Sequence, residues 1–242
     1  CLLAVDFSGI QKYIFDINNK SAAKKLRARS FFVDLILEEI KLELLELFDT
    51  TICNVIFQAG GKFYILLPNI SDIKQKINKF KLKLEKDLVA EFNAHINFRV
   101  AITDPFSGID FENFGDILSE INIKLNQEKN HAFALYLQEN EFEIKKNFHK
   151  SSLCESCRKF NKKSGEESCF WCAQDEKIGR ELVDDNNTFI ILFNDINKGK
   201  FKLLHHSFSI SNEINNNNED ISYIFVYNFD EKESADWVTD FN

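Results

Sequence analysis

The feature that most constrains this chain is a set of four cysteines arranged as two Cys-x-x-Cys pairs, Cys154 with Cys157 and Cys169 with Cys172. Eleven residues separate the two pairs, which is close to the spacing read as a zinc site. Four thiolates satisfy the tetrahedral preference of Zn²⁺ and leave no position for water, so the predicted role of the metal is structural. Two disulfides, or four reduced thiols without metal, are the alternatives.

Charge and composition exclude several classes of protein. The 242 residues carry a formal net charge of −8, which argues against nucleic-acid binding over the whole surface and leaves only local contacts. The first apolar run contains Asp6 and follows no basic segment, so it is unlike a secretory signal. No apolar run reaches the ~18 residues of a membrane span. We therefore expect a reducing, cytoplasmic location, which favours zinc over disulfides. The absence of methionine suggests a fragment of a longer protein.

Residues 1–150 follow the element order of a ferredoxin-like domain. Gly60-Gly61 predicts a tight hairpin. Ser30 is the expected N-cap of a long helix, which follows a basic connection at residues 20–29. The order is β-α-β-β-α-β, with strands expected at 2–7, 52–57, 63–67 and 97–102 and helices at 10–15, 31–48 and 71–92. In the last of these helices the apolar residues recur at helical spacing, at Ile73, Ile77, Phe80, Leu84 and Leu88. A further helix at 112–129 and a strand at 132–137 are expected to follow.

The remainder of the chain is predicted to hold two smaller parts. Residues 151–184 form a zinc-ribbon module around the four cysteines, which ends in a short helix at 175–183. Residues 185–242 form a β-rich segment in which a polar, asparagine-rich loop at 215–219 separates two of the strands, expected at 188–193, 200–204 and 221–227. The predicted fold class is thus α+β: a ferredoxin-like domain, then a zinc ribbon, then the β-rich segment.

One carboxylate stands where a palm-type nucleotidyl cyclase would bind metal. Asp6 ends the first strand, and the hairpin between the second and third strands carries Gly60-Gly61. In such cyclases Asp6 and an acidic residue after the Gly-Gly pair would hold Mg²⁺ against a triphosphate, because Mg²⁺ demands carboxylate oxygens. Here that second position is Lys62, which cannot ligate Mg²⁺. We therefore predict an inactive palm with no catalytic residue.

Several segments taken together resemble the large subunit of type III-A (Csm) CRISPR effector complexes. They are Asp6–Gln11, Lys25–Phe31, Gly60–Phe63 with Leu67-Pro68, and the paired cysteines followed by Ile178-Gly179. The resemblance implies a first, GGDEF-like palm at residues 1–150, a zinc-bearing linker domain at 151–184, and a segment leading toward a second palm at 185–242.

In that family an HD nuclease domain precedes this region, and a second palm with a Gly-Gly-Asp-Asp motif makes cyclic oligoadenylates from ATP. Neither motif occurs in this sequence. The resemblance therefore implies a parent protein that is a single-stranded DNA nuclease and a cyclic oligoadenylate synthetase, and a chain that is inactive alone. It also implies ATP and Mg²⁺ binding only together with the second palm. The implied partners are other Csm-complex subunits and, through the complex, CRISPR RNA and target RNA, with no membrane.

The candidate nucleotide- or phosphate-binding residues share a position near the first strand end, the Gly-Gly hairpin or the basic segment between them. They are Asp6, Ser8, Gly9, Lys25, Arg27, Arg29, Gly60, Gly61 and Lys62. Backbone amides at Ser8-Gly9 could meet a phosphate at a helix start. Each candidate also has a structural interpretation: Asp6 caps the next turn, Ser8-Gly9 is only a turn, and the basic residues are a solvated face.

Three functions follow. The leading hypothesis is a fragment of an RNA-guided antiviral complex whose non-catalytic palm contributes to ATP binding and to assembly of the synthetase. The second is a stand-alone degenerate cyclase domain that senses a nucleotide. The third is a zinc-ribbon scaffold without a nucleotide site, which has no need of the basic segment.

Overall fold

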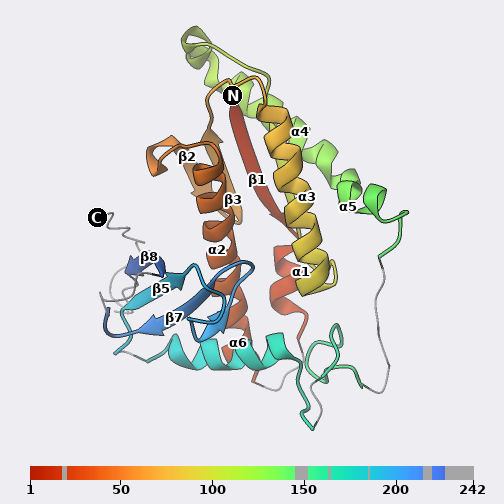
Figure 1. Ribbon diagram of the computed structural model, residues 1–242, viewed down its shortest axis with the longest axis vertical. Coiled ribbons are helices and arrows are strands. Elements are labelled where there is room, and N and C mark those ends of the chain that lie inside the picture. Colours follow the sequence, from red (N-terminus) through yellow and green to blue (C-terminus); the bar gives the residue numbers. More distant parts are fainter. Residues whose placement is uncertain (18–20, 145–151, 163–164, 185, 215–219, 227–242) are drawn as a thin grey trace. The chain divides into compact units, whose positions relative to one another are not determined.

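The computed structural model describes residues 1–17, 21–144, 152–162, 165–184, 186–214 and 220–226 (Figure 1). These residues fall into two compact units, one drawn from residues 1–13 and 33–147 and the other from 14–32 and 148–242. Each unit contains a four-stranded antiparallel sheet. Helices α1 (Ile10–Phe15) and α2 (Ala22–Leu47) contain residues of both units. The fold is therefore mixed α/β.

The sheet of the first unit has the strand order β2-β3-β1-β4. Its central strand β1 (Leu2–Ser8) pairs with β3 (Lys62–Leu66) on one side and with β4 (Asn97–Ile102) on the other, while β2 (Val55–Ala59) forms the edge. A strand with neighbours on both sides and both faces covered reads as a continuous apolar run. This explains why Leu2–Phe7 is buried throughout.

The hairpin between β2 and β3 turns on Gly60 and Gly61, as predicted. Both residues have positive φ, 61° and 82°, which a two-residue hairpin of this twist requires and which only glycine adopts at little cost. Gly61 also lies close to the start of α1, because a Cβ there would stand 2.0 Å from Ile10 Cδ1.

Two faces of this sheet are packed differently. Leu2, Ala4, Tyr64 and Ala101 face α4 (Phe114–Gln127), whose contribution to the cluster is Ile117, Ile121 and Leu125. On α3 (Ile73–Phe92), which contacts β4, the predicted apolar positions are buried at helical spacing, namely Ile73, Ile77, Phe80, Leu84 and Leu88. Both helices were expected from the sequence, α3 from its apolar spacing, and both are confirmed.

The long helix begins earlier than predicted, so the expectation of an N-cap at Ser30 is wrong. Helix α2 starts at Ala22, so the basic residues from Lys24 to Arg29, which were expected in a connection, are helical. The local reason is propensity, because residues 22–29 consist of alanine, lysine, leucine and arginine, which are strong helix formers.

Other differences from the predicted elements are smaller. The expected strand at 132–137 is instead helix α5 (Ala134–Glu139), and the Glu85 carboxylate accepts a hydrogen bond from the Tyr136 amide at 2.7 Å. Residues Ile52–Asn54 form a 3₁₀ turn before β2. Two further 3₁₀ turns, Gly108–Asn113 and Glu128–His131, flank α4.

The second unit combines helix α6 with its own sheet, whose order is β6-β7-β5-β8. The helix covers Phe170–Glu181, five residues earlier than expected. The strands are β5 (Phe189–Phe193), β6 (Phe201–Lys202), β7 (Ser207–Ser211) and β8 (Ile221–Val226). Strand β7 was not predicted, and the predicted polar loop at 215–219 lies outside the described residues. In the described part of the chain, no helix combines the length and apolarity needed to cross a membrane.

Candidate functional site

The first cysteine pair lies in a small hairpin. Leu153 and Asn161 form a β-bridge, and the Cys154 amide donates to the Phe160 carbonyl at 2.8 Å. The turn between them is closed by the Arg158 amide, which donates to the Cys154 carbonyl at 2.9 Å. Arg158 has a φ of 54°, a left-handed conformation that reverses the chain within a few residues. The hairpin therefore brings Cys154 and Cys157 to the same side of one turn.

The second pair is placed by the start of a helix. Cys169 is the N-cap of α6, and its sulfur accepts a hydrogen bond from the Cys172 amide at 3.5 Å. The partial positive charge of a helix N-terminus stabilises a thiolate there. The sequence missed this part of the helix because Cys169 replaces the usual oxygen-bearing cap.

All four sulfurs form one buried cluster. They lie within 4.8 Å of one another, and the residues are 0 to 6% exposed. The Cys157 and Cys169 sulfurs are 3.8 Å apart. Four sulfurs at the usual Zn–S distance of about 2.3 Å from a common centre would stand about 3.8 Å from one another in a tetrahedron. All four cysteines are free thiols. The donor set and its spacing therefore fit a tetrahedral, thiolate-preferring metal ion.

The electrostatics of the cluster also favour a bound cation. Hydrogen bonds from the Cys157, Cys169 and Cys172 thiols lower the pKa of Cys154. Hydrogen bonding with Cys154 and Cys157, together with burial, raises the pKa of Cys169 and of Cys172. Because buried thiolates at this spacing repel one another, all four can ionise together only around a positive charge.

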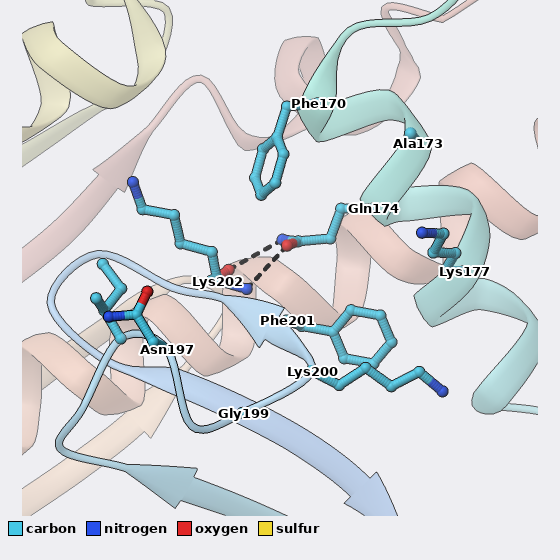
Figure 2. A pocket seen from close by; sticks show the side chains of 10 residues that line it. Phe170, Ala173, Gln174, Lys177, Asn197, Gly199, Lys200, Phe201 and Lys202 are labelled. Carbon is cyan, nitrogen blue, oxygen red and sulfur yellow. Dashed lines mark hydrogen bonds between the residues drawn. The ribbon is translucent and has the colours of Figure 1, made fainter.

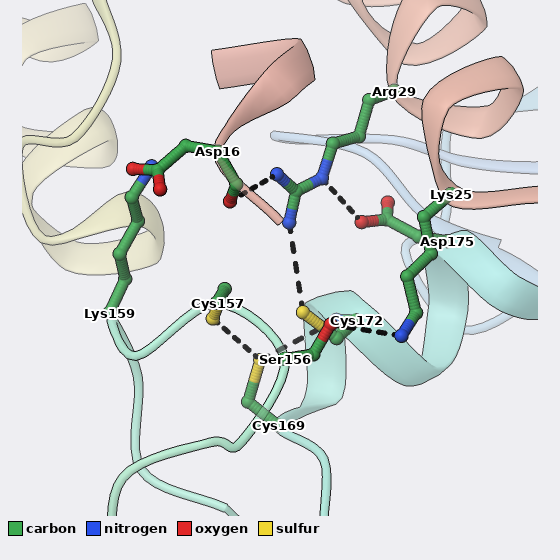
Figure 3. A network of polar contacts seen from close by, with 9 residues as sticks. All are labelled: Asp16, Lys25, Arg29, Ser156, Cys157, Lys159, Cys169, Cys172 and Asp175. Carbon is green, nitrogen blue, oxygen red and sulfur yellow. Dashed lines mark hydrogen bonds and ion pairs between the residues drawn. The ribbon is translucent and has the colours of Figure 1, made fainter. Parts of the chain in front are cut away.

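The basic segment of α2 packs on this cluster within the second unit (Figure 3). Arg29 donates through Nε to Asp175 Oδ2 at 2.9 Å and through Nη2 to the Cys172 sulfur at 3.7 Å. Lys25 donates to Ser156 Oγ at 2.9 Å, between the first two cysteines. Burial raises the pKa of Asp175 to about 6, although Arg29 and Lys25 act in the opposite direction.

These contacts test whether the basic residues of α2 form a solvated face. Lys25 and Arg29 are 3% and 4% exposed, so the interpretation of a solvated face is wrong for both. Arg27 is exposed and donates to the Gly179 carbonyl at 3.0 Å. A phosphate-binding role for the three residues stays a prediction.

The other predicted phosphate-binding residues come together at one end of the first sheet. The Phe7 amide donates to the Gly61 carbonyl at 2.8 Å, and Gly9 starts α1 by accepting from the Tyr13 amide at 2.9 Å. The end of β1, with Ser8 and Gly9, therefore lies beside the Gly60-Gly61 turn. Both Gly9 and Gly60 are exposed.

Asp6 has a basic residue opposite it on each of its two neighbouring strands. In the register of β1 its direct neighbours are Lys62 on β3 and Arg99 on β4. Its carboxylate forms an ion pair with Arg99, and Asp6 is 8% exposed. Lys62 in turn donates to Asn122 on α4 at 3.4 Å. Arg99 was not among the site residues predicted from the sequence. The alternation of Asn97–Ile102 already indicated that Arg99 and every second residue of that strand lie on one face of the sheet.

Comparison with known proteins identifies the family of this chain. A sequence model described as Csm1 subunit domain B matches residues 1–150, which is more than half of the chain. The chain belongs to the Csm1 family. The resemblance drawn from its motifs is thereby confirmed.

Relatives of this Csm1 domain carry the same family name. A segment of 138 residues is 28% identical to the CRISPR system single-strand-specific deoxyribonuclease Cas10/Csm1 (subtype III-A) of Enterococcus italicus, and covers 55% of this chain but 18% of that protein. A segment of 110 residues is 36% identical to the protein of that description from Thermococcus onnurineus, and covers 46% of this chain and 14% of the relative. The matches thus span less than a fifth of each relative.

Solved structures agree on the fold. A Csm1–Csm4 cassette in complex with cA4 matches with 31% identity and a TM-score of 0.50 over 55% of this chain and 19% of that one. A Csm1–Csm4 cassette in complex with one ATP matches at 23% identity and a TM-score of 0.64, and covers 87% of this chain and 25% of that one. The second likeness extends beyond the Csm1 domain B region and shows that the fold of most of the chain is that of Csm1.

A pocket in the second unit was not foreseen from the sequence (Figure 2). It has a volume of about 460 Å³ and lies beside α6 and β6, lined by Phe170, Ala173, Gln174, Lys177, Ile196, Asn197, Gly199, Lys200, Phe201 and Lys202. Gln174 is already occupied, because its side-chain amide exchanges hydrogen bonds of 2.9 and 2.8 Å with the backbone of Lys202. The lining holds three lysines but no carboxylate, histidine, hydroxyl or thiol.

Proposed function

We propose that this chain supplies the non-catalytic first palm and the metal-bearing linker of a Csm1-type large subunit in a type III-A CRISPR complex. Residues 1–150 would form a ferredoxin-like palm, followed by the zinc-ribbon module at 151–184 and the β-rich segment at 185–242. The strand order β2-β3-β1-β4, with every neighbouring pair antiparallel, supports this because it is the order of a split β-α-β pair.

The observation that carries the proposal is the pairing of Asp6. A catalytic palm needs two free carboxylates to hold Mg²⁺. Here the carboxylate of Asp6 is already bound by Arg99, and Lys62 stands directly across on β3. Two cations beside one carboxylate oppose the binding of a divalent cation. This supports a palm that contributes to binding but performs no chemistry.

The nucleotide contact would lie at the sheet end that holds Ser8, Gly9, Gly60, Gly61 and Lys62. Gly9 and Gly60 are exposed there, and backbone amides together with a lysine suit phosphate oxygens. Solved Csm1–Csm4 cassettes have been obtained with one ATP and with cA4. We propose that this palm binds ATP only together with a second palm, within a complex that contains a Csm4-type subunit, CRISPR RNA and target RNA.

The cysteine cluster would hold one Zn²⁺ through Cys154, Cys157, Cys169 and Cys172. The metal would supply structural stabilisation and no open coordination position. Residues 152–162 offer few large apolar side chains, so metal ligation would be the main source of their stability.

The test compares the isolated chain with the assembled complex. The purified chain with ATP and Mg²⁺ should form no oligoadenylate, which chromatography of the products would detect. In the complex, Asp6→Asn should retain synthesis within about threefold, whereas Lys62→Glu should lower ATP affinity through charge repulsion. Lys79→Glu, on an exposed position of α3, is the matched control and should behave as wild type.

Three outcomes would contradict the proposal. Oligoadenylate formation by the chain alone, or complete loss of synthesis in Asp6→Asn, would make this palm catalytic. Tight ATP binding by the isolated chain would favour a stand-alone nucleotide sensor instead.

A further inference from the structure

Two cations lie buried beside four thiols in a chain whose net charge is −8. Lys25 and Arg29 are one helical turn apart on α2, so they share one face of that helix. Their exposures of 3% and 4% mean that both have given up most of their hydration. Burial of a charge is costly unless a partner of opposite charge compensates. The groups around these two residues must therefore supply that compensation.

Arg29 donates hydrogen bonds to two groups on one face of α6. Asp175 follows Cys172 by three residues, which places both side chains on the same side of the helix. The guanidinium spans them, with Nε on the carboxylate at 2.9 Å and Nη2 on the sulfur at 3.7 Å, while Nη1 donates to the Asp16 carbonyl at 3.2 Å (Figure 3). Arginine suits this position because its planar fork holds several acceptors at fixed angles.

Lys25 reaches the other cysteine pair. Its ammonium donates at 2.9 Å to Ser156, which stands between Cys154 and Cys157 and is 7% exposed. The backbone is also closely packed here, because a Cβ on Gly179 would lie 2.1 Å from the Lys24 carbonyl oxygen. The start of α2 is therefore held at both cysteine pairs and along α6.

The charges explain why cations are needed at these positions. Four thiolates around one divalent cation carry a net charge of about −2, and buried Asp175 adds a further negative charge. Arg29 and Lys25 offset two of these three charges. In the absence of metal the thiols can remain protonated, and Asp175 alone faces the two cations.

We propose that Lys25 and Arg29 are the internal counter-cations of the metal–tetrathiolate centre, so that metal binding and docking of residues 21–29 on the cysteine module are thermodynamically linked. This inference rests on the metal site proposed above. Because the linkage is reciprocal, removal of the metal loosens the docking of the start of α2, and removal of the two cationic side chains lowers the affinity for the metal. The segment that the sequence assigned to phosphates would then serve the metal centre.

The simpler possibility is that Arg29 only neutralises Asp175. In that case the ion pair stabilises the fold, and substitution of Arg29 leaves the metal affinity unchanged. The two possibilities differ in the metal-binding constant and in the spectrum of the metal–thiolate bond, which a purely structural ion pair would not change.

The first experiment measures metal affinity on the full chain. After chelation under reducing conditions, Co²⁺ is added to record the metal–thiolate spectrum, and Zn²⁺ affinity is determined by competition with a chromophoric chelator. Arg29→Met and Lys25→Met should each weaken Zn²⁺ binding by roughly 10- to 100-fold, as removal of groups that support metal ligands commonly does. Arg29→Lys should recover part of the loss. Arg27→Met, which removes a cation bound to a carbonyl on the same helix, is the matched control and should change affinity less than about threefold.

The second experiment uses the wild-type chain and so does not depend on the folding of a variant. Hydrogen exchange of amides 22–32 should slow when Zn²⁺ is added and quicken when it is chelated, whereas amides of β1 should not respond. Metal-independent exchange at 22–32, or unchanged Zn²⁺ affinity in Arg29→Met together with a normal cobalt–thiolate spectrum, would overturn this inference alone. A wild-type chain without any cobalt–thiolate spectrum would overturn the metal site itself, and this inference with it.

Discussion

The two units each contain an arginine–carboxylate pair, partly buried in the first and fully buried in the second, but they position it by different means. In the first unit the register of β1 and β4 sets Asp6 opposite Arg99 on a sheet whose strands and helices bury a large apolar core. In the second unit Arg29 meets Asp175 beside four cysteines. The backbone hydrogen bonds of the sheet fix the geometry of the first pair. The geometry of the second pair depends on whatever holds the four thiols together.

This difference predicts where each unit is vulnerable. The first unit should tolerate loss of metal, because its stability comes from apolar burial. The hairpin of residues 152–162 has few apolar side chains and should depend on metal ligation. Variants that affect one unit and leave the other unchanged would sharpen this contrast, and a variant that affected both equally would break it.

The largest effect is expected from Cys169→Ser. The substitution removes one thiolate ligand and leaves a hydroxyl that can still cap α6, so the effect reports loss of metal, and a structural zinc contributes roughly 10 kcal/mol or more to such modules. Zinc content should fall, and amides of residues 154–161 and of α6 should exchange rapidly while β1 and β3 stay protected. Cys53→Ser, at an exposed cysteine outside the cluster, is the control. Protected α6 amides in a zinc-free Cys169→Ser protein would contradict the expectation.

Arg99→Met should come next and should act on the first unit. Without Arg99 the Asp6 carboxylate, 8% exposed, loses its ion-pair partner. We expect a loss of about 2–3 kcal/mol, below the cost for a fully buried pair because both side chains keep some contact with water. Urea denaturation would measure it, and adding Asp6→Asn should recover part of the loss. Altered zinc content in Arg99→Met would show that the units are not independent in this respect.

A pair of glycine substitutions should give intermediate effects, one in each unit. Gly61→Ala places a Cβ at a φ of 82° and 2.0 Å from Ile10 Cδ1. Gly179→Ala places one 2.1 Å from the Lys24 carbonyl oxygen. Each should cost roughly 1–3 kcal/mol, with Gly179→Ala the larger because a backbone atom cannot rotate away. Hydrogen exchange should locate the loss in the unit that carries the substitution, and loss in the other unit would refute the assignment.

The smallest effect is expected from Glu85→Gln. Burial raises the pKa of Glu85 in the folded chain, although hydrogen bonds from Tyr136 and Leu135 oppose the shift. A carboxyl with a raised folded pKa binds its proton more tightly in the native state, so the stability of the wild-type chain falls as pH rises from about 4.5 through that pKa.

Glutamine still accepts from Tyr136 without carrying a charge. At pH 7 the variant should therefore be equal to wild type or more stable by less than about 1 kcal/mol, and its advantage should shrink as pH is lowered toward 4.5. Thermal denaturation across that range would measure the difference. Glu112→Gln, at an exposed position, should show no such trend. A growing advantage at low pH would contradict the sign of the shift.

Much of the fold was predictable because its determinants are local. The Gly60-Gly61 pair predicted the hairpin, since few other sequences adopt positive φ at two successive positions. The apolar spacing of residues 73–88 predicted α3, and the four cysteines predicted their own cluster. The early start of α2 was also available from helix propensity, but the density of lysine and arginine suggested an exposed connection instead.

Most helices and strands, the cysteine cluster and the family could thus be predicted from local patterns, whereas β7 and the helical conformation of α5 could not. The roles of the charged residues became clear only in the folded chain. Arg29 and Asp175 are 146 positions apart, Lys25 and Ser156 are 131 apart, and Asp6 and Arg99 are 93 apart. A buried charge is defined by its partner, and no local pattern shows that Lys25 and Arg29 are buried while Arg27, between them on the same helix, is exposed. That distinction arises because only one face of α2 packs on the cysteine module.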